Sequence, residues 1–201
     1  MKAGTGIAAQ LYKGEARVRP LGAHEWQLYR TLRLRSLADA PEAFCSTLAD
    51  EEARTDKDWA WRVHLGASSG RDRPLVAELD GIPVGLAWAK ADADDASVVN
   101  LFQVWVAPEA RGRGVAVALL DAALGWAGSR GARAMQLGVV CGNEAARRLY
   151  ERAGFRALGE PEPQRPGSSQ LEQRMRLDLI GSSGGPGRDR IHAHAVTPAE
   201  R

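Results

Sequence analysis

The stretch "VWVAPEARGRGVAVALLDAALGWA", residues 104–127, decides the fold expected for this chain. An apolar strand ends at a proline, a short loop alternates arginine with glycine, and an amphipathic helix follows. The first backbone amides of a helix lack intrahelical partners and lie at the positive end of the helix dipole, so they attract anions. Glycine permits a positive φ and lets an anion approach without a Cβ in the way. The segment therefore predicts a pyrophosphate site at a helix N-terminus.

The familiar nucleotide-binding motifs do not fit this loop. The dinucleotide pattern G-x-G-x-x-G fails because Val117 stands where the third glycine is needed, and no Gly-Lys-Ser/Thr follows as a P-loop requires. A nucleotide-binding domain of Rossmann type is therefore a poor alternative. Arg111 and Arg113 can add charge-assisted contacts to a phosphate. Taken alone, the loop is also compatible with a plain glycine-rich connection.

Composition limits the classes of function. The 201 residues suffice for one domain, and 44% apolar with 26% charged residues is typical of a globular protein. A net charge of +2 is too small to indicate nucleic-acid binding, and no apolar stretch is long enough to span a membrane. Cys45 and Cys141 have no metal-ligand spacing and are too few for a disulfide framework. We expect a cytoplasmic protein without a metal, a nucleic-acid partner or a membrane partner.

The periodicity of the apolar residues predicts an α/β fold, with helices on both faces of one mixed sheet. Asp80 and Gly81 form the expected hairpin turn. We expect a single domain over 14–180, a flexible leader over 1–13 and a disordered Gly/Ser/Pro-rich tail over 181–201. The predicted strands are 16–21, 74–79, 82–90, 97–107, 134–140, 155–158 and 171–179, and the predicted helices are 24–39, 50–65, 114–131 and 143–155.

A second motif lies downstream of the loop, in "NEAARRLYERAGF", residues 143–155. It resembles the "NxxAxxLYexxGF" segment of the GNAT superfamily of N-acetyltransferases, and Arg111–Ala116 resembles that family's Q/R-x-x-G-x-G/A signature. The resemblance covers roughly 15–180 and is strong over 98–156. Two motifs in the family's order are more specific than either alone. The residues of the second motif in register are Asn143, Ala146, Leu149, Tyr150, Gly154 and Phe155.

The resemblance implies the GNAT acyltransferase fold, a mostly antiparallel sheet that is splayed between the long strand 97–107 and strand 134–140. It also implies acetyl-CoA as cosubstrate. The backbone of Val104, Trp105 and Val106 would pair with the pantetheine amides. Asn143 would lie beside the pantetheine, and Tyr150 near the thioester sulfur. The pyrophosphate would lie on the loop and first helical turn, formed by Arg111, Gly112, Arg113, Gly114, Val115, Ala116 and Val117.

The implied activity is acetyl transfer from acetyl-CoA to a primary amine by direct attack in a ternary complex. Tyr150 is the expected catalytic residue, because a phenol can protonate a departing thiolate. The general base is unassigned: Asn100 and Gly138 stand where family members often carry a glutamate. A water chain, an amine of lowered pKa, or a more distant group could serve instead, the distant groups being Glu51, Glu52, Glu78 and His64.

The acceptor is less well defined. The acid-rich segment 39–58 belongs to the region that walls the acceptor pocket in this family, so it would attract a cationic amine; a solvated acidic helix start is the alternative. Both a small molecule and a peptide amine remain open as acceptors, and the sequence neither supports nor opposes a homodimer. The alternative function is a catalytically silent acyl-CoA-binding regulatory module, since the expected carboxylates are missing.

Overall fold

The computed structural model describes residues 14–179, so the predictions of a leader over 1–13 and a tail over 181–201 lie outside the described residues. The α-helices are α1 Trp26–Asp39, α2 Leu48–Glu52, α3 Asp56–Ser68, α4 Val115–Ser129 and α5 Glu144–Arg152. The strands are β1 Arg17–Pro20, β2 Asp72–Leu79, β3 Ile82–Ala91, β4 Val98–Val106, β5 Ala134–Val140, β6 Arg156–Ala157, β7 Glu162–Pro163 and β8 Leu171–Asp178.

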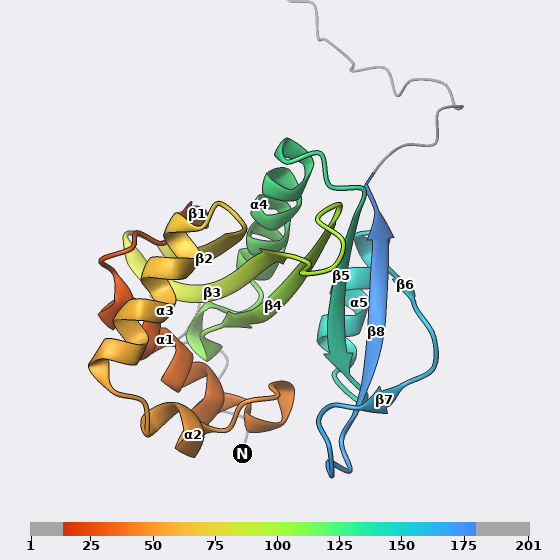
Figure 1. Ribbon diagram of the computed structural model, residues 1–201, viewed down its shortest axis with the longest axis horizontal. Coiled ribbons are helices and arrows are strands. Elements are labelled where there is room, and N and C mark those ends of the chain that lie inside the picture. The colour runs from red at the N-terminus through yellow and green to blue at the C-terminus, as the bar shows by residue number, and fades with distance from the viewer. Residues whose placement is uncertain (1–13, 180–201) are drawn as a thin grey trace, which may run out of the picture.

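The strands form one sheet in the order β1-β2-β3-β4-β5-β8-β6, with β7 paired to β8 (Figure 1). Every pair in it is antiparallel except β4–β5, which is parallel and joined through α4. A crossover helix is the usual way to connect parallel neighbours. The predicted mixed, mostly antiparallel sheet is confirmed.

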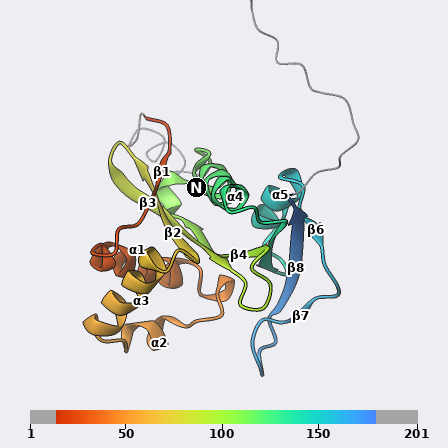
Figure 2. The same ribbon diagram turned by 45° about the horizontal axis from the view of Figure 1, so that its top comes forward.

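Helices cover both faces of the sheet, as the alternation along β3 requires (Figure 2). On one face, the Trp88 ring lies edge-on to Tyr29 of α1, with 5.3 Å between ring centroids, and against Gly66 of α3. On the other face, Gly85 lies under Val115 and Leu119 of α4. The apolar core therefore consists of two layers, one on each side of β3.

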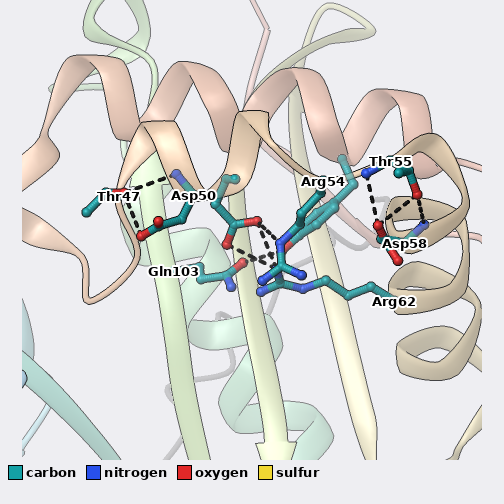
Figure 3. Close-up of polar contacts among 9 residues, drawn as sticks. Thr47, Asp50, Arg54, Thr55, Asp58, Arg62 and Gln103 are labelled. Carbon is teal, nitrogen blue, oxygen red and sulfur yellow. Dashed lines mark hydrogen bonds and ion pairs between the residues drawn. The ribbon is translucent and has the colours of Figure 1, made fainter.

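The prediction of one helix over 50–65 is wrong, because two threonines start two separate helices there. Thr47 caps α2 by accepting a hydrogen bond from the backbone N–H of Asp50. Thr55 and Asp58 form a reciprocal capping box at the start of α3 (Figure 3). A capping box satisfies two otherwise unpaired amides, so it favours a new helix over continuation of the first.

Strand β4 leaves β5 part of the way along its length. The two strands pair only from Val98 to Leu101, and beyond Leu101 they diverge (Figure 1). At that point the pairing of β4 with β3 shifts register between Leu86 and Trp88, so that Gln103 and its neighbour oppose a single residue. Gln103 has a φ of +58°, in the left-handed region. This is a β-bulge, which bends a strand locally, and it accounts for the predicted splay between β4 and β5.

The bulge is held by a hydrogen bond from α1. The Tyr29 hydroxyl donates to Gln103 Oε1 at 2.8 Å, and Tyr29 is 1% exposed. Burial raises the pKa of Tyr29, so the hydroxyl remains a protonated donor at any physiological pH. The bond compensates part of the strain of a non-glycine residue at positive φ.

Tyr29→Phe is expected to lower the free energy of unfolding by about 1–2 kcal/mol, because Gln103 loses its buried donor while the aromatic packing is retained. Chemical denaturation checks the value. The reverse change on the partner, Gln103→Gly, removes the left-handed strain together with the bond, so it should cost less than Tyr29→Phe. Equal stability of Tyr29→Phe and the parent protein would contradict this role.

Candidate active site

The gap between β4 and β5 opens into a cavity of about 730 Å³. Its walls come from the bulged half of β4, the end of β5, α5, β8 and the segment after α1. Residues of α1 and α3 complete the wall. The side chains that matter for chemistry on these walls are Arg33, Cys45, Arg62, Asp72, Lys90, Asp92, Asn143, Tyr150 and Glu172.

Tyr150 lies on α5, faces this cavity and is 6% exposed. Its ring packs against Phe155 with 5.8 Å between centroids, which fixes the direction of the hydroxyl. Burial raises the pKa of Tyr150 to about 12. The phenol is therefore protonated at neutral pH, which is the state that a proton donor needs.

Two other residues expected at the cosubstrate also line the cavity, Val104 of β4 and Asn143. Asn143 is the N-cap of α5, where its Oδ1 accepts a hydrogen bond of 3.1 Å from the backbone N–H of Ala146. The same cap sets the start of the helix that presents Tyr150. The structure thus brings Val104 of β4 together with two residues of the second motif, Asn143 and Tyr150.

The predicted anion loop has the geometry expected of it. Gly112 and Gly114 have φ values of +74° and +77°, and a Cβ added at either would meet no atom within 4 Å. Gly114 is the N-cap of α4, with no side chain capping the helix. The following turn runs through Val115, which is buried, to Val117, which is 47% exposed. The first amides of α4 are available to an anion, and open space lies in front of the loop.

Several residues predicted near the cosubstrate have structural partners instead of facing the cavity. The Trp105 indole donates to Asp39 Oδ2 at 2.8 Å, and Arg111 forms an ion pair with the same carboxylate. Arg111 Nε also donates to the carbonyl of Val106 at 3.1 Å. Arg111 therefore ties the loop to β4 and to the end of α1.

Glu172 is a cavity residue that the sequence motifs missed. It lies on β8 and reaches across β5 at Gly138, where a Cβ would overlap its carboxylate. The carboxylate therefore occupies the space of the side chain that Gly138 lacks. Burial raises the pKa of Glu172, and Arg174 only partly opposes this. The register of β8 against β5 decides this placement, and no local sequence signal carries it.

The carboxylates considered from the sequence are engaged elsewhere. Glu51 is held between Arg54 and Arg62, whose charges lower its pKa although burial acts to raise it. Glu78 accepts a hydrogen bond from Arg19 at 2.9 Å. None of the groups proposed from the sequence lines the cavity, namely Glu51, Glu52, Glu78 and His64.

Two other carboxylates of the cavity are already hydrogen-bonded. Asp72 accepts from the Trp88 indole at 2.9 Å. Asp92 accepts from Asn100 at 2.7 Å, and this bond together with two backbone N–H groups lowers the pKa of Asp92. The lowered pKa makes Asp92 a poor proton acceptor, whereas the raised pKa of Glu172 gives that carboxylate basic character.

Residues 43–46 of the acid-rich segment line the cavity, but the acidic side chains of the segment do not. Most of these acidic side chains form caps and ion pairs, and Figure 3 shows two of them, Asp50 and Asp58, beside the threonines they bond. The structure gives the hypothesis of a cationic acceptor no support, because the residues that carried it do not line the cavity: Asp39, Glu42, Asp50, Glu51, Glu52, Asp56 and Asp58.

The splayed sheet, the glycine loop at the start of α4 and the buried tyrosine on α5 are the arrangement expected of an acetyltransferase fold. Residues 32–155 match the sequence profile of the family described as "Acetyltransferase (GNAT) family". The match spans more than half of the chain, and the chain belongs to this family.

Two curated relatives give the degree of similarity. The mycothiol acetyltransferase of Beutenbergia cavernae is 33% identical over 156 residues, which are 74% of this chain and 48% of the relative. An uncharacterized N-acetyltransferase of Methanocaldococcus jannaschii is 32% identical over 105 residues, 49% of this chain and 46% of the relative. The chain spans about half the length of these relatives.

Solved structures agree in fold. An acetyltransferase of the GNAT family from Streptococcus pneumoniae has a TM-score of 0.69 at 26% identity, over 83% of this chain and all of that chain. The yncA protein of Salmonella typhimurium, solved with its cofactor acetyl-CoA, has a TM-score of 0.68 at 19% identity, over 85% of this chain and 98% of that one. The second likeness concerns the fold alone.

Two features are absent from residues 14–179. No helix in this range is long and apolar enough to cross a bilayer. In the same range, no three His, Cys, Asp or Glu side chains come together as a metal site would need.

Proposed function

We propose that this protein transfers the acetyl group of acetyl-CoA to a primary amine by direct attack in a ternary complex. The observation that carries the proposal is the cavity at the β4–β5 gap, which holds a buried phenol and a half-buried carboxylate of raised pKa, Tyr150 and Glu172. A proton donor and a proton acceptor in one cavity are what acetyl transfer to an amine needs.

The residues present fit acetyl-CoA. The unpaired edge of β4 beyond Leu101 leaves backbone groups available to the pantetheine amides. The left-handed glycines Gly112 and Gly114 place the uncapped amides of α4 before open space, which suits the pyrophosphate. The backbone of Val104–Val106, the turn Arg111–Val117 and Asn143 are accordingly the proposed cosubstrate-binding residues.

Acetyl-CoA, when bound, supplies the acetyl group as a thioester. Glu172 accepts a proton from the attacking amine as the nitrogen–carbon bond forms, and its raised pKa makes it a better base than an ordinary surface glutamate. Tyr150 donates its hydroxyl proton to the sulfur as the carbon–sulfur bond breaks. The products are the N-acetylated amine and CoA, so the net change moves one proton from nitrogen to sulfur. Exchange with solvent then removes the proton from Glu172 and returns one to Tyr150. The presence of Glu172 favours this enzyme over the silent binding module.

Gly114→Asp tests the loop, with Gly114→Asn as its matched control. Both side chains bear the same strain at positive φ, so the difference between them isolates the charge. The carboxylate should weaken acetyl-CoA binding at least about tenfold relative to asparagine, by repulsion of the pyrophosphate. It should not lower the unfolding midpoint below that of Gly114→Asn, because a negative charge suits this end of α4.

Calorimetric titration of acetyl-CoA and thermal melts give both values. Equal affinity of the two variants would remove the loop from the binding site. Tighter binding of ATP or NAD than of acetyl-CoA to the parent protein would contradict the proposed function itself.

Glu172→Gln should lower kcat/KM about 100-fold or more, since general bases contribute on this order. The carboxylate works only when ionised, so the rate should rise with pH through a pKa above the ordinary glutamate value of 4.5. That limb of the profile should disappear in the variant. Glu162→Gln, an exposed change opposite Glu172 on β7, is the matched control and should leave the profile unchanged. An unaltered profile in Glu172→Gln would exclude Glu172 as the base.

Tyr150→Phe keeps the ring that packs on Phe155 and removes only the hydroxyl. The single-turnover rate should fall about 100-fold, while the Kd for acetyl-CoA changes less than about threefold. Rapid-quench measurement of acetyl transfer separates this step from product release. A parent-like single-turnover rate would remove Tyr150 from the mechanism.

A further inference from the structure

Arg33 of α1 is a buried charge without a counterion. It is 2% exposed, and it forms no ion pair with any residue of the range 14–179. Its Nε has no hydrogen-bond partner, and Nη1 makes a single long contact of 3.5 Å with Ser36 Oγ. Arginine stays charged in proteins and has five N–H donors to satisfy. A charge in this situation is costly to bury unless an anion pairs with it.

The carboxylate whose charge acts on Arg33, Glu51, is already occupied. Glu51 lies between Arg54 Nε at 2.8 Å and Arg62 Nη1 at 3.1 Å. Figure 3 shows the guanidinium groups of these two arginines converging beside Gln103. Both oxygens of Glu51 accept hydrogen bonds from Arg54 and Arg62. Arg33 is therefore left as a cation with no carboxylate of its own in the described part of the chain.

Arg33 lines the cavity, and its guanidinium lies over the Phe44 ring at 4.6 Å from the centroid. Stacking on a ring fixes the plane of a guanidinium and leaves its edge free to form a fork of hydrogen bonds. Cys45, the residue after Phe44, is influenced by both Arg33 and the proposed base Glu172. Burial raises the pKa of the Cys45 thiol. The charge of Glu172 raises this pKa further, and the charge of Arg33 lowers it. Arg33, Cys45 and Glu172 all line the cavity, and the charges of Arg33 and Glu172 both act on this thiol.

We propose that the amine acceptor carries a carboxylate and that Arg33 binds it, an inference that rests on the proposed acetyl transfer. The acceptor is then of the amino-acid type: its carboxylate pairs with Arg33 while its amine faces Glu172. A planar carboxylate matches the fork of a guanidinium in two parallel hydrogen bonds. The carboxylate of the substrate would then supply the counterion that Arg33 lacks among the described residues.

The experiment compares the common L-α-amino acids with their α-carboxamides, which keep the amine and lose the negative charge. Turnover with acetyl-CoA and binding by ligand-observed NMR are both measured, the latter on the protein alone and on protein saturated with CoA. At least one amino acid should be preferred over its carboxamide by 30-fold or more. In Arg33→Met, KM for that acid should rise about 10- to 100-fold with kcat nearly unchanged, and the preference should vanish.

Two variants separate this role from a structural one. Arg33→Met removes an unpaired buried charge and keeps an apolar stem, so its unfolding midpoint should equal or exceed that of the parent. Arg33→Lys should recover part of the preference, since it keeps the charge without the fork. Arg30→Met, an exposed change on the same helix whose partner is Asp56, should keep the preference in full.

The outcomes distinguish the two proposals. Carboxamides accepted as well as the acids, or no amino acid bound by the protein alone or with CoA, would overturn the carboxylate site while leaving acetyl transfer to other amines in place. A preference that survives in Arg33→Met, or a large loss of stability in that variant, would overturn it too. Failure of acetyl-CoA to bind would instead defeat the proposed function, and NMR on the protein alone would still test Arg33.

Discussion

The hydrogen bond from Tyr29 to Gln103 holds the one irregularity on which the rest of the structure depends. It supports a left-handed residue in the middle of β4, and the resulting bulge takes β4 away from β5 after Leu101. A regular strand would have continued the parallel ladder and closed the gap. The cavity, the free edge of β4 and the exposure of Tyr150 to the cavity all follow from this single bend.

The fold could be predicted from the sequence because its decisive signals are local. Gly112 and Gly114 indicate a positive φ, Asn143 indicates a helix start, and Asp80-Gly81 indicates a hairpin; each is borne out by the observed dihedrals or pairing. The single helix over 50–65 failed for an equally local reason. The threonine caps at Thr47 and Thr55 divide it, and the prediction did not take these caps into account.

The site was predictable only in part, because its other half depends on packing between distant elements. Nothing near Glu172 in the sequence marks it as functional, since its place over Gly138 is fixed by the antiparallel register of β8 on β5. The unpaired state of Arg33 is also a property of three dimensions. It follows from Glu51 being taken by two other arginines, which sequence spacing does not reveal. The acid-rich segment misled for the same reason, because most of its carboxylates form caps and ion pairs away from the cavity.

The contact between Glu172 and Gly138 also bears on how this site can change over generations. A side chain at position 138 and a glutamate at position 172 compete for the same volume, so neither position can vary freely while the other is kept. Any relative that gains a carboxylate at the β5 position must first shorten or redirect the residue on β8. The carboxylate can therefore be placed in the same volume from either β5 or β8. Movement between them requires paired substitutions, with the single mutants as less fit intermediates.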